Sequence, residues 1–171
     1  MTLTPGACWN PSPNFGDRRD QQQPCLIVLH YTAMQTAEEA LERLCDPLHE
    51  VSAHYLISAE GQLWQMVDEG ARAWHAGAGS WQGVADVNSR SIGIELANNG
   101  RVPFAAPQMA RLEELLAELL PRWGIPPSGV IGHSDIAPTR KFDPGSKFDW
   151  RRLAQAGLSI WPDAASEEDP D

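Results

Sequence analysis

The 171-residue chain lacks three features that would each point to a large class of proteins. No apolar run approaches the roughly 20 residues that a transmembrane helix requires. Lys and Arg total 13 against 23 Asp and Glu, a net charge of -10. Phosphate contacts need clustered basic residues, so we expect no nucleic-acid partner. The three cysteines are odd in number and show no CxxC spacing, which argues against a disulfide scaffold and a cysteine-rich structural zinc site.

Length and composition are typical of one globular domain. A hydrophobic fraction of 42% over 171 residues is sufficient for a core. Residues 1–22, rich in Pro and Gly, are expected to form an extended arm, residues 23–162 the domain, and residues 163–171 a solvated acidic tail. The chain as given has no signal-peptide pattern, so a cytoplasmic location is expected, with a periplasmic one as the alternative if a signal was removed.

Hydrophobic patterns predict strands and helices that alternate along the chain. Strands are expected at residues 25–30, 54–58, 62–67, 91–96 and 130–133. Helices are expected at 37–44, capped by Thr36 with Glu39, from Pro107 onward, and near Trp150. Pro121 should kink or end the second of these helices. The alternation predicts an α/β fold in which helices flank a central mixed β-sheet.

Two of the predicted strands end in histidine. His30 ends the first apolar run and His133 the last, and a Pro- and Gly-rich loop after His133 carries Asp143. Two imidazoles and one carboxylate are a common ligand set for catalytic zinc, with the fourth position open for water. Asp135, two residues after His133, competes with Asp143 as the third ligand, because extended geometry could also present it.

A carboxylate and an ammonium are candidates for the remaining chemistry of a hydrolase. Glu95 lies in the apolar strand 91–96, where desolvation raises a carboxyl pKa toward the range of a general base. Lys141 lies two residues before Asp143 and could stabilise a developing oxyanion. The competing interpretations are a buried salt-bridge residue for Glu95 and a solvated loop charge for Lys141.

Five ordered segments resemble the zinc-dependent N-acetylmuramoyl-L-alanine amidases of the type 2 amidase family, which are related in fold to peptidoglycan recognition proteins. The segments are VLHYTA at 28–33, VSAHYLI at 51–57, AWHAG at 73–77, NSRSIGIEL at 88–96 and GHSDIAPTRKFDPG at 132–145. The resemblance implies that fold, a Zn²⁺ site of His30, His133 and Asp143, and catalytic roles for Glu95 and Lys141. It therefore favours Asp143 over Asp135.

The same segments and the irregular stretch 70–90 supply candidate substrate-binding residues. Loops of this kind often hold binding groups, and Arg favours carboxylate recognition. Trp74 and Trp81 could stack on sugar or cover the peptide, whereas His54, inside a hairpin strand, is expected to be structural. The predicted substrate-binding set is Tyr31, Arg72, Trp74, His75, Ala76, Asn88 and Arg140.

The resemblance implies hydrolysis of the amide bond between N-acetylmuramic acid and L-alanine in muropeptides. We expect the 1,6-anhydro form as substrate, in cell-wall recycling, and a monomeric protein whose partner is a muropeptide or peptidoglycan fragment. One alternative is a periplasmic amidase of broader specificity, which the stretch AQAGLSIWPD at 154–163 resembles. Another is a non-catalytic muropeptide receptor. Another class of zinc peptidase lacks support, because no HExxH motif is present.

Overall fold

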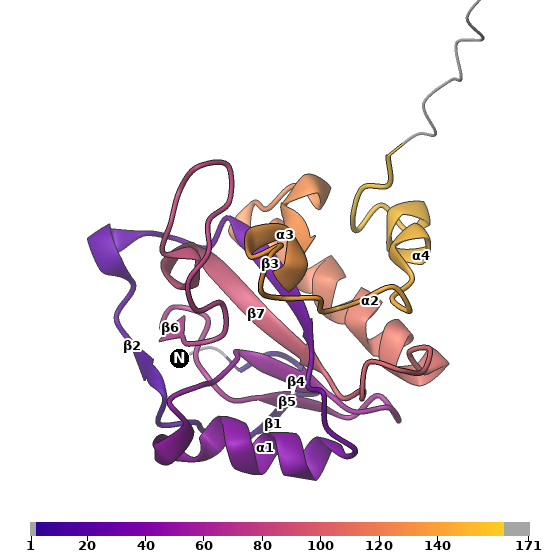
Figure 1. Ribbon diagram of the computed structural model, residues 1–171, viewed down its shortest axis with the longest axis horizontal. Coiled ribbons are helices and arrows are strands. Elements are labelled where there is room, and N and C mark those ends of the chain that lie inside the picture. The colour runs from indigo at the N-terminus through magenta and orange to yellow at the C-terminus, as the bar shows by residue number, and fades with distance from the viewer. Residues whose placement is uncertain (1–2, 163–171) are drawn as a thin grey trace, which may run out of the picture.

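The computed structural model describes residues 3–162, and in this part of the chain six strands form one mixed sheet (Figure 1). The strand order is β1-β5-β4-β7-β3-β8, with a single antiparallel pair, β4 and β5. The strands are β1 (Cys8–Trp9), β3 (Leu26–Tyr31), β4 (Tyr55–Ile57), β5 (Leu63–Gln65), β7 (Ser91–Leu96) and β8 (Val130–Gly132). The predicted α/β fold with a mixed sheet is therefore confirmed.

One face of the sheet is covered by the long helix α2 (Ala106–Trp123). Alternate residues of β3 and β7, such as Ile27 and Ile92, pack there in the largest hydrophobic cluster together with Leu112 and Leu116 of the helix. The helix continues past Pro121 and ends at Trp123, with Gly124 left-handed at φ 64°. Of the two effects predicted for Pro121, a kink or the end of the helix, the second is wrong, because this proline lies in the last turn and the C-cap glycine follows it.

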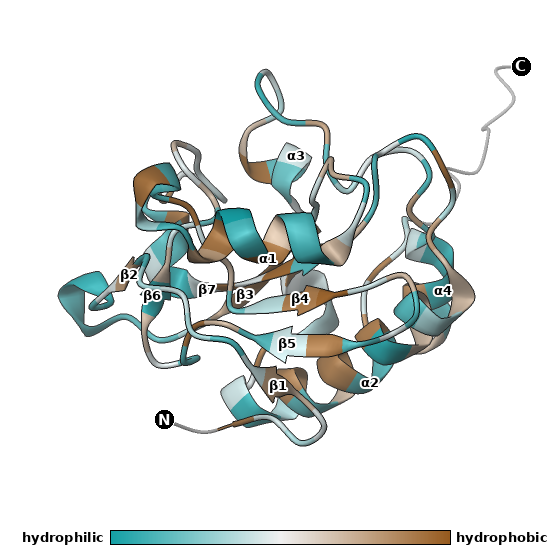
Figure 2. Ribbon diagram, turned by 90° about the horizontal axis from the view of Figure 1, so that it is seen from below, coloured by the Kyte–Doolittle hydropathy of each residue, from teal (hydrophilic) through white to brown (hydrophobic). Residues whose placement is uncertain are grey.

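Helix α1 (Ala37–Cys45) covers the opposite face over β4 and β5, as Figure 2 shows. Its Ala40 and Leu44 pack against Leu56 and Met66. Thr36 accepts a hydrogen bond from the backbone N–H of Glu39, so the predicted N-cap is confirmed. Farther along the same face, the segment 73–90 and the short helix α3 (His133–Ile136) lie over β3 and β8. Helix α4 (Trp150–Gln155) follows near the C-terminus.

The N-terminal segment lies along the domain rather than apart from it. Strand β1 pairs with β5, and β2 (Phe15–Gly16) pairs with β6 (Arg72–Ala73) in a second, two-stranded sheet. The Arg18 guanidinium donates hydrogen bonds to the backbone carbonyls of Asn88, Ser89, Ser91 and Glu69. The predicted acidic tail at 163–171 falls outside the described residues. Among the described residues, every helix is too short or too polar to cross a membrane.

Strands β4, β7, β3 and β8 run parallel, so their carboxyl ends meet at one edge of the sheet. His30 lies near this end of β3, Glu95 near this end of β7, and His133 directly after β8. The register pairs His30 with Glu95 on neighbouring strands. Side chains from three distant parts of the sequence are thereby brought to one place.

Candidate functional site

Three ligand atoms converge at the carboxyl ends of β3 and β8. The Nδ1 atoms of His30 and His133 lie 2.9 Å apart, and each lies 3.0 Å from Oδ2 of Asp143. The three residues are only 1%, 3% and 8% exposed, respectively. Burial lowers the pKa of His30 to about 4, which keeps its imidazole neutral and able to bind a metal.

Local structure fixes each of these side chains. His133 is the first residue of α3, and its Nε2 lies 2.9 Å from the backbone carbonyl of Ala76. The Asp143 carbonyl accepts a hydrogen bond from the backbone N–H of Ser134, which holds the loop after α3 against the start of that helix. The two loops are also joined by Arg140, which donates to the carbonyls of Ala76 and Ala78.

The hydrogen bonding of His133 indicates that the two Nδ1 atoms and Oδ2 of Asp143 are suited to bind a cation. A carbonyl oxygen only accepts, so Nε2 of His133 must carry its proton toward Ala76. In a neutral imidazole with this tautomer, Nδ1 is a bare lone pair, and here it faces a carboxylate oxygen at 3.0 Å. Donor atoms on a tetrahedral zinc lie about 3.3 Å apart, given bonds of about 2.0–2.1 Å. A small outward shift of these side chains would therefore accommodate a metal.

The Glu95 side chain is partly buried, and one of its carboxylate oxygens has no partner. Its Oε2 is inaccessible and accepts no hydrogen bond. Desolvation, and then the negative charge of Asp143, raise the pKa of Glu95 to about 8, while Lys141 opposes the rise. Desolvation thus raises the pKa of Glu95, as expected from the sequence. Within residues 3–162, Glu95 forms no ion pair. This arrangement favours proton transfer over a salt bridge.

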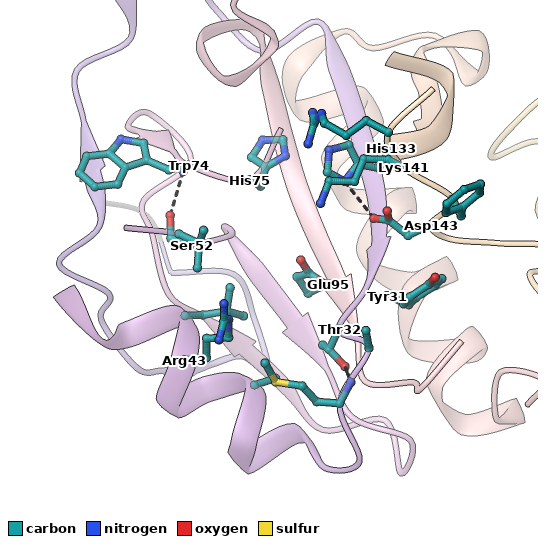
Figure 3. Close-up of a pocket in the computed structure, with 17 residues that line it drawn as sticks. Tyr31, Thr32, Arg43, Ser52, Trp74, His75, Glu95, His133, Lys141 and Asp143 are labelled. Carbon is teal, nitrogen blue, oxygen red and sulfur yellow. Dashed lines mark hydrogen bonds and ion pairs between the residues drawn. The ribbon is translucent and has the colours of Figure 1, made fainter. Parts of the chain in front are cut away.

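Glu95 lines a pocket of about 360 Å³ at the carboxyl edge of the sheet (Figure 3). One wall carries Asp143 and Lys141, and the opposite wall carries Trp74 and Arg43, with Glu95 between them. The lining residues are Tyr31, Thr32, Ala33, Met34, Ala40, Arg43, Leu44, Val51, Ser52, Trp74, His75, Glu95, His133, Arg140, Lys141, Phe142 and Asp143.

The predicted substrate-binding residues divide into two groups. Tyr31, Trp74, His75 and Arg140 line the pocket, whereas Arg72, Ala76 and Asn88 do not. Arg72 is ion-paired with Asp86 at 2.7 Å and also donates to Ser89. Asn88 is buried, and its side-chain oxygen accepts from the backbone N–H groups of His75 and Ala76. The second group holds the segment 73–90 in place and does not face the cavity.

Three further sequence expectations concern residues near the site. The carboxylate of Asp135, the competing third ligand, accepts from the backbone N–H of Gly132 at 2.7 Å and lies outside the cluster of ligand atoms. His54 is buried, and its Nδ1 accepts from the N–H of Gly93, in keeping with a structural role. Trp81 packs against the hydrophobic cluster beside β3 and β8 and not in the pocket.

Sequence reasoning did not identify Arg43. This exposed residue lies on α1, and among residues 3–162 its guanidinium has no ion-pair partner. Its spacing from Ala40 and Leu44 places it beside the buried face of the helix. That spacing was a usable signal, but only the packing of α1 against the sheet brings this edge of the helix to the pocket.

Known amidases are similar to this chain in sequence. Residues 20–146 match a family model described as N-acetylmuramoyl-L-alanine amidase. The chain is 41% identical over 155 residues to the N-acetylmuramoyl-L-alanine amidase AmiD of Escherichia coli, covering 81% of this chain and 55% of AmiD. It is 35% identical over 159 residues to the 1,6-anhydro-N-acetylmuramyl-L-alanine amidase AmpD of Haemophilus influenzae, covering 82% of this chain and 86% of AmpD.

A solved structure supports the fold assignment. The complex of E. coli AmiD with the substrate anhydro-N-acetylmuramic acid-L-Ala-D-γ-Glu-L-Lys superposes with a TM-score of 0.76 at 37% identity. The match covers 90% of this chain and 69% of the AmiD chain. The match spans little more than half of the AmiD sequence.

Proposed function

We propose, from the premise that this chain belongs to the N-acetylmuramoyl-L-alanine amidase family, that it hydrolyses the amide bond between N-acetylmuramic acid and L-alanine in muropeptides. One observation carries the proposal. Three buried ligand atoms lie within 3.0 Å of one another, and two of their residues, His133 and Asp143, line the same pocket as Glu95 with its unpaired carboxylate oxygen. Amide hydrolysis needs an activated water, a proton carrier and a stabilised oxyanion, and this pocket offers groups for each.

His30, His133 and Asp143 would hold one zinc ion through Nδ1, Nδ1 and Oδ2. This donor set is a usual one for a catalytic site, in which three protein ligands leave a position open. When bound, zinc supplies Lewis-acid chemistry and lowers the pKa of water to roughly 7. The absence of a cysteine in the set is consistent with a catalytic site.

Glu95 is assigned the proton transfers. It takes a proton from the attacking water and returns it to the nitrogen of the leaving L-alanine. Burial raises the pKa of Glu95, which makes its carboxylate a stronger base than an exposed one and better able to hold the proton between the two transfers. Its strand neighbours Ile94 and Leu96 are apolar, and no hydrogen-bond donor within residues 3–162 reaches Oε2.

Lys141 is assigned the stabilisation of the oxyanion that forms on the scissile carbonyl. It lines the pocket two residues before Asp143, so one loop positions both the ligand and the ammonium. Within residues 3–162 the Lys141 ammonium forms no ion pair, and its charge is therefore free to act on substrate.

We assign recognition of the sugar and peptide to the pocket walls. The half-buried Trp74 ring offers a stacking face, and its backbone N–H donates to Ser52. The peptide of the AmiD complex contains a γ-linked D-Glu, whose α-carboxylate remains free. The unpaired guanidinium of Arg43 is suited to such a carboxylate.

The 1,6-anhydro form in cell-wall recycling is the proposed substrate, by similarity to the AmpD relative. A broader peptidoglycan amidase is the second candidate, because the identity to AmiD is higher, at 41% against 35%. A cytoplasmic location accompanies the first candidate and a periplasmic location the second, and fractionation of the expressing cells tests the difference.

The zinc-loaded protein should be incubated with matched anhydro and non-anhydro muropeptides and the products identified by mass. We expect free stem peptide and the sugar lactyl acid, with loss of activity on chelation and recovery with zinc. A His133→Ala variant should bind no stoichiometric zinc, whereas Asp135→Asn should retain it. Cleavage at equal rates would favour the broader amidase. Tight binding of muropeptide without cleavage would identify a receptor and refute the proposed activity.

A further inference from the structure

His75 contacts the ligand residue His30 on the side away from the other two, a contact that its predicted role in substrate binding does not explain. Its ring is nearly buried, and its Nδ1 lies 3.0 Å from Nε2 of His30. The two rings meet edge to face, with centroids 5.1 Å apart and an interplanar angle of 81°. His75 therefore contacts the nitrogen of His30 that faces away from the ligand atoms.

The direction of this contact follows from a chain of hydrogen bonds that begins at Val87. The Ser91 hydroxyl lies 2.6 Å from the Val87 carbonyl oxygen, and the carbonyl only accepts, so the hydroxyl donates its one proton there. Nε2 of His75 lies 3.1 Å from the same hydroxyl oxygen, which has only lone pairs left. The Nε2 of His75 must therefore carry the proton and donate it.

The next hydrogen bond in this series, between His75 and His30, assigns the tautomer of His30. A neutral imidazole carries one proton, and since that of His75 lies on Nε2, its Nδ1 is a bare lone pair. This bare Nδ1 accepts from His30, whose proton must lie on Nε2. The Nδ1 of His30 is then a bare lone pair directed at the cluster. Ser91, through His75, thus gives His30 the same tautomer that the Ala76 carbonyl gives His133.

The backbone around His75 is adapted to this position. A Cβ on Gly93 would lie 2.4 Å from Cγ of the His75 ring, so only glycine leaves space for the ring. Ser91, Gly93 and Glu95 alternate on one face of β7, and this face lies toward the site. Asn88 accepts from the backbone N–H of His75 and fixes the segment that carries the ring.

We propose that His75 and Ser91 are positioning residues that hold His30 in the tautomer and orientation required for zinc binding. The inference rests on the proposed metal site. At other metal centres, residues that hydrogen-bond to a metal-binding histidine orient its ring and fix its tautomer, and His75 and Ser91 are assigned this role here. Loss of such a partner typically weakens metal binding by about 10–100-fold. If the residues only filled space, their hydrogen-bonding groups would have no effect on the metal.

Zinc affinity measured by competition with a chelator tests the proposal. Ser91→Ala removes the hydroxyl, and His75→Phe keeps a ring of similar width without an acceptor. Both should weaken zinc binding by about 10-fold or more, whereas Ser91→Thr, which restores the hydroxyl, should recover most of the affinity. Ser12→Ala is the matched control, because Ser12 is also buried and also donates to a backbone carbonyl, that of Leu44 on α1, but hydrogen-bonds none of the three ligand residues.

Nitrogen-15 NMR of the imidazoles adds a readout that packing alone does not change. The wild-type protein should show His30 protonated on Nε2, and Ser91→Ala should shift the His30 and His75 signals toward mixed tautomers. Wild-type zinc affinity in both Ser91→Ala and His75→Phe, or a loss equal to that in Ser12→Ala, would overturn the proposal. A wild-type protein that binds no zinc would instead refute the metal site itself, and the two failures are thereby distinguished.

Discussion

Replacement of Glu95 by glutamine should have opposite effects on catalysis and on folding stability. The substitution keeps the shape of the side chain and removes its charge. Because Oε2 is buried without a partner, the ionised carboxylate is unfavourable in the folded protein. The Glu95→Gln variant should therefore be more stable than the wild-type protein once the wild-type carboxyl ionises, provided that the metal has been removed.

The size of this effect follows from the pKa. Folding raises the pKa of Glu95 from 4.5 to about 8, so the folded protein holds this proton more tightly than the unfolded chain. The contribution of this bound proton to the free energy of unfolding is complete below about pH 4.5. It is lost as the pH rises to about 8. The folded and unfolded pKa values differ by about 3.5, and each pKa unit corresponds to roughly 1.4 kcal/mol. The upper limit of this contribution to the free energy of unfolding is therefore roughly 5 kcal/mol. The amide has no equivalent proton, so its contribution does not change with pH.

The assay is denaturant unfolding of both metal-free proteins at several pH values between about 4.5 and 9. The stability of the variant relative to wild type should rise with pH over this range by several kcal/mol. In zinc-loaded protein the same variant should keep its metal and lose about 10²–10⁴-fold in turnover. A stability difference that does not depend on pH would refute the argument from burial. Near wild-type turnover with zinc bound would remove Glu95 from the proton transfers.

Three further substitutions test other parts of the structure. Trp74→Ala should raise KM more than it lowers kcat, because stacking contributes equally to ground and transition states, and an unchanged KM would contradict its place in the pocket wall. Arg43→Met should raise KM by about 10-fold for substrates with a free stem carboxylate, while Arg43→Lys should lose less; equal KM values for all three proteins would exclude carboxylate binding. Glu69→Ala should cost about 3–5 kcal/mol of folding stability, because Glu69 is 4% exposed and bonds Tyr55, Arg122 and Trp123. Its zinc affinity should match wild type in chelator competition, and a loss would link this distant cluster to the site.

The predictions made from sequence agree best with the structure where one local pattern dominates. Strand β7 at Ser91–Leu96 and helix α1 from Ala37 follow from period-2 and period-3.6 alternation with a defined cap. The position of His30 at the end of an apolar run predicted the edge at which it lies. Pro121 was misjudged, because a proline in the last turn of a helix is tolerated when the C-cap follows closely.

The sequence by itself determined the fold class and the residue types available to the site, because hydrophobic periodicity and motif spacing are properties of consecutive residues. Only the tertiary structure decided between Asp135 and Asp143 as the carboxylate at the cluster, since backbone path sets which oxygen reaches the histidines. The tertiary structure likewise placed His75 behind His30 and brought Arg43 to the pocket wall. Hydrogen-bond direction and cavity walls depend on atoms from strands and loops that are distant in sequence, and no local pattern records how those elements meet.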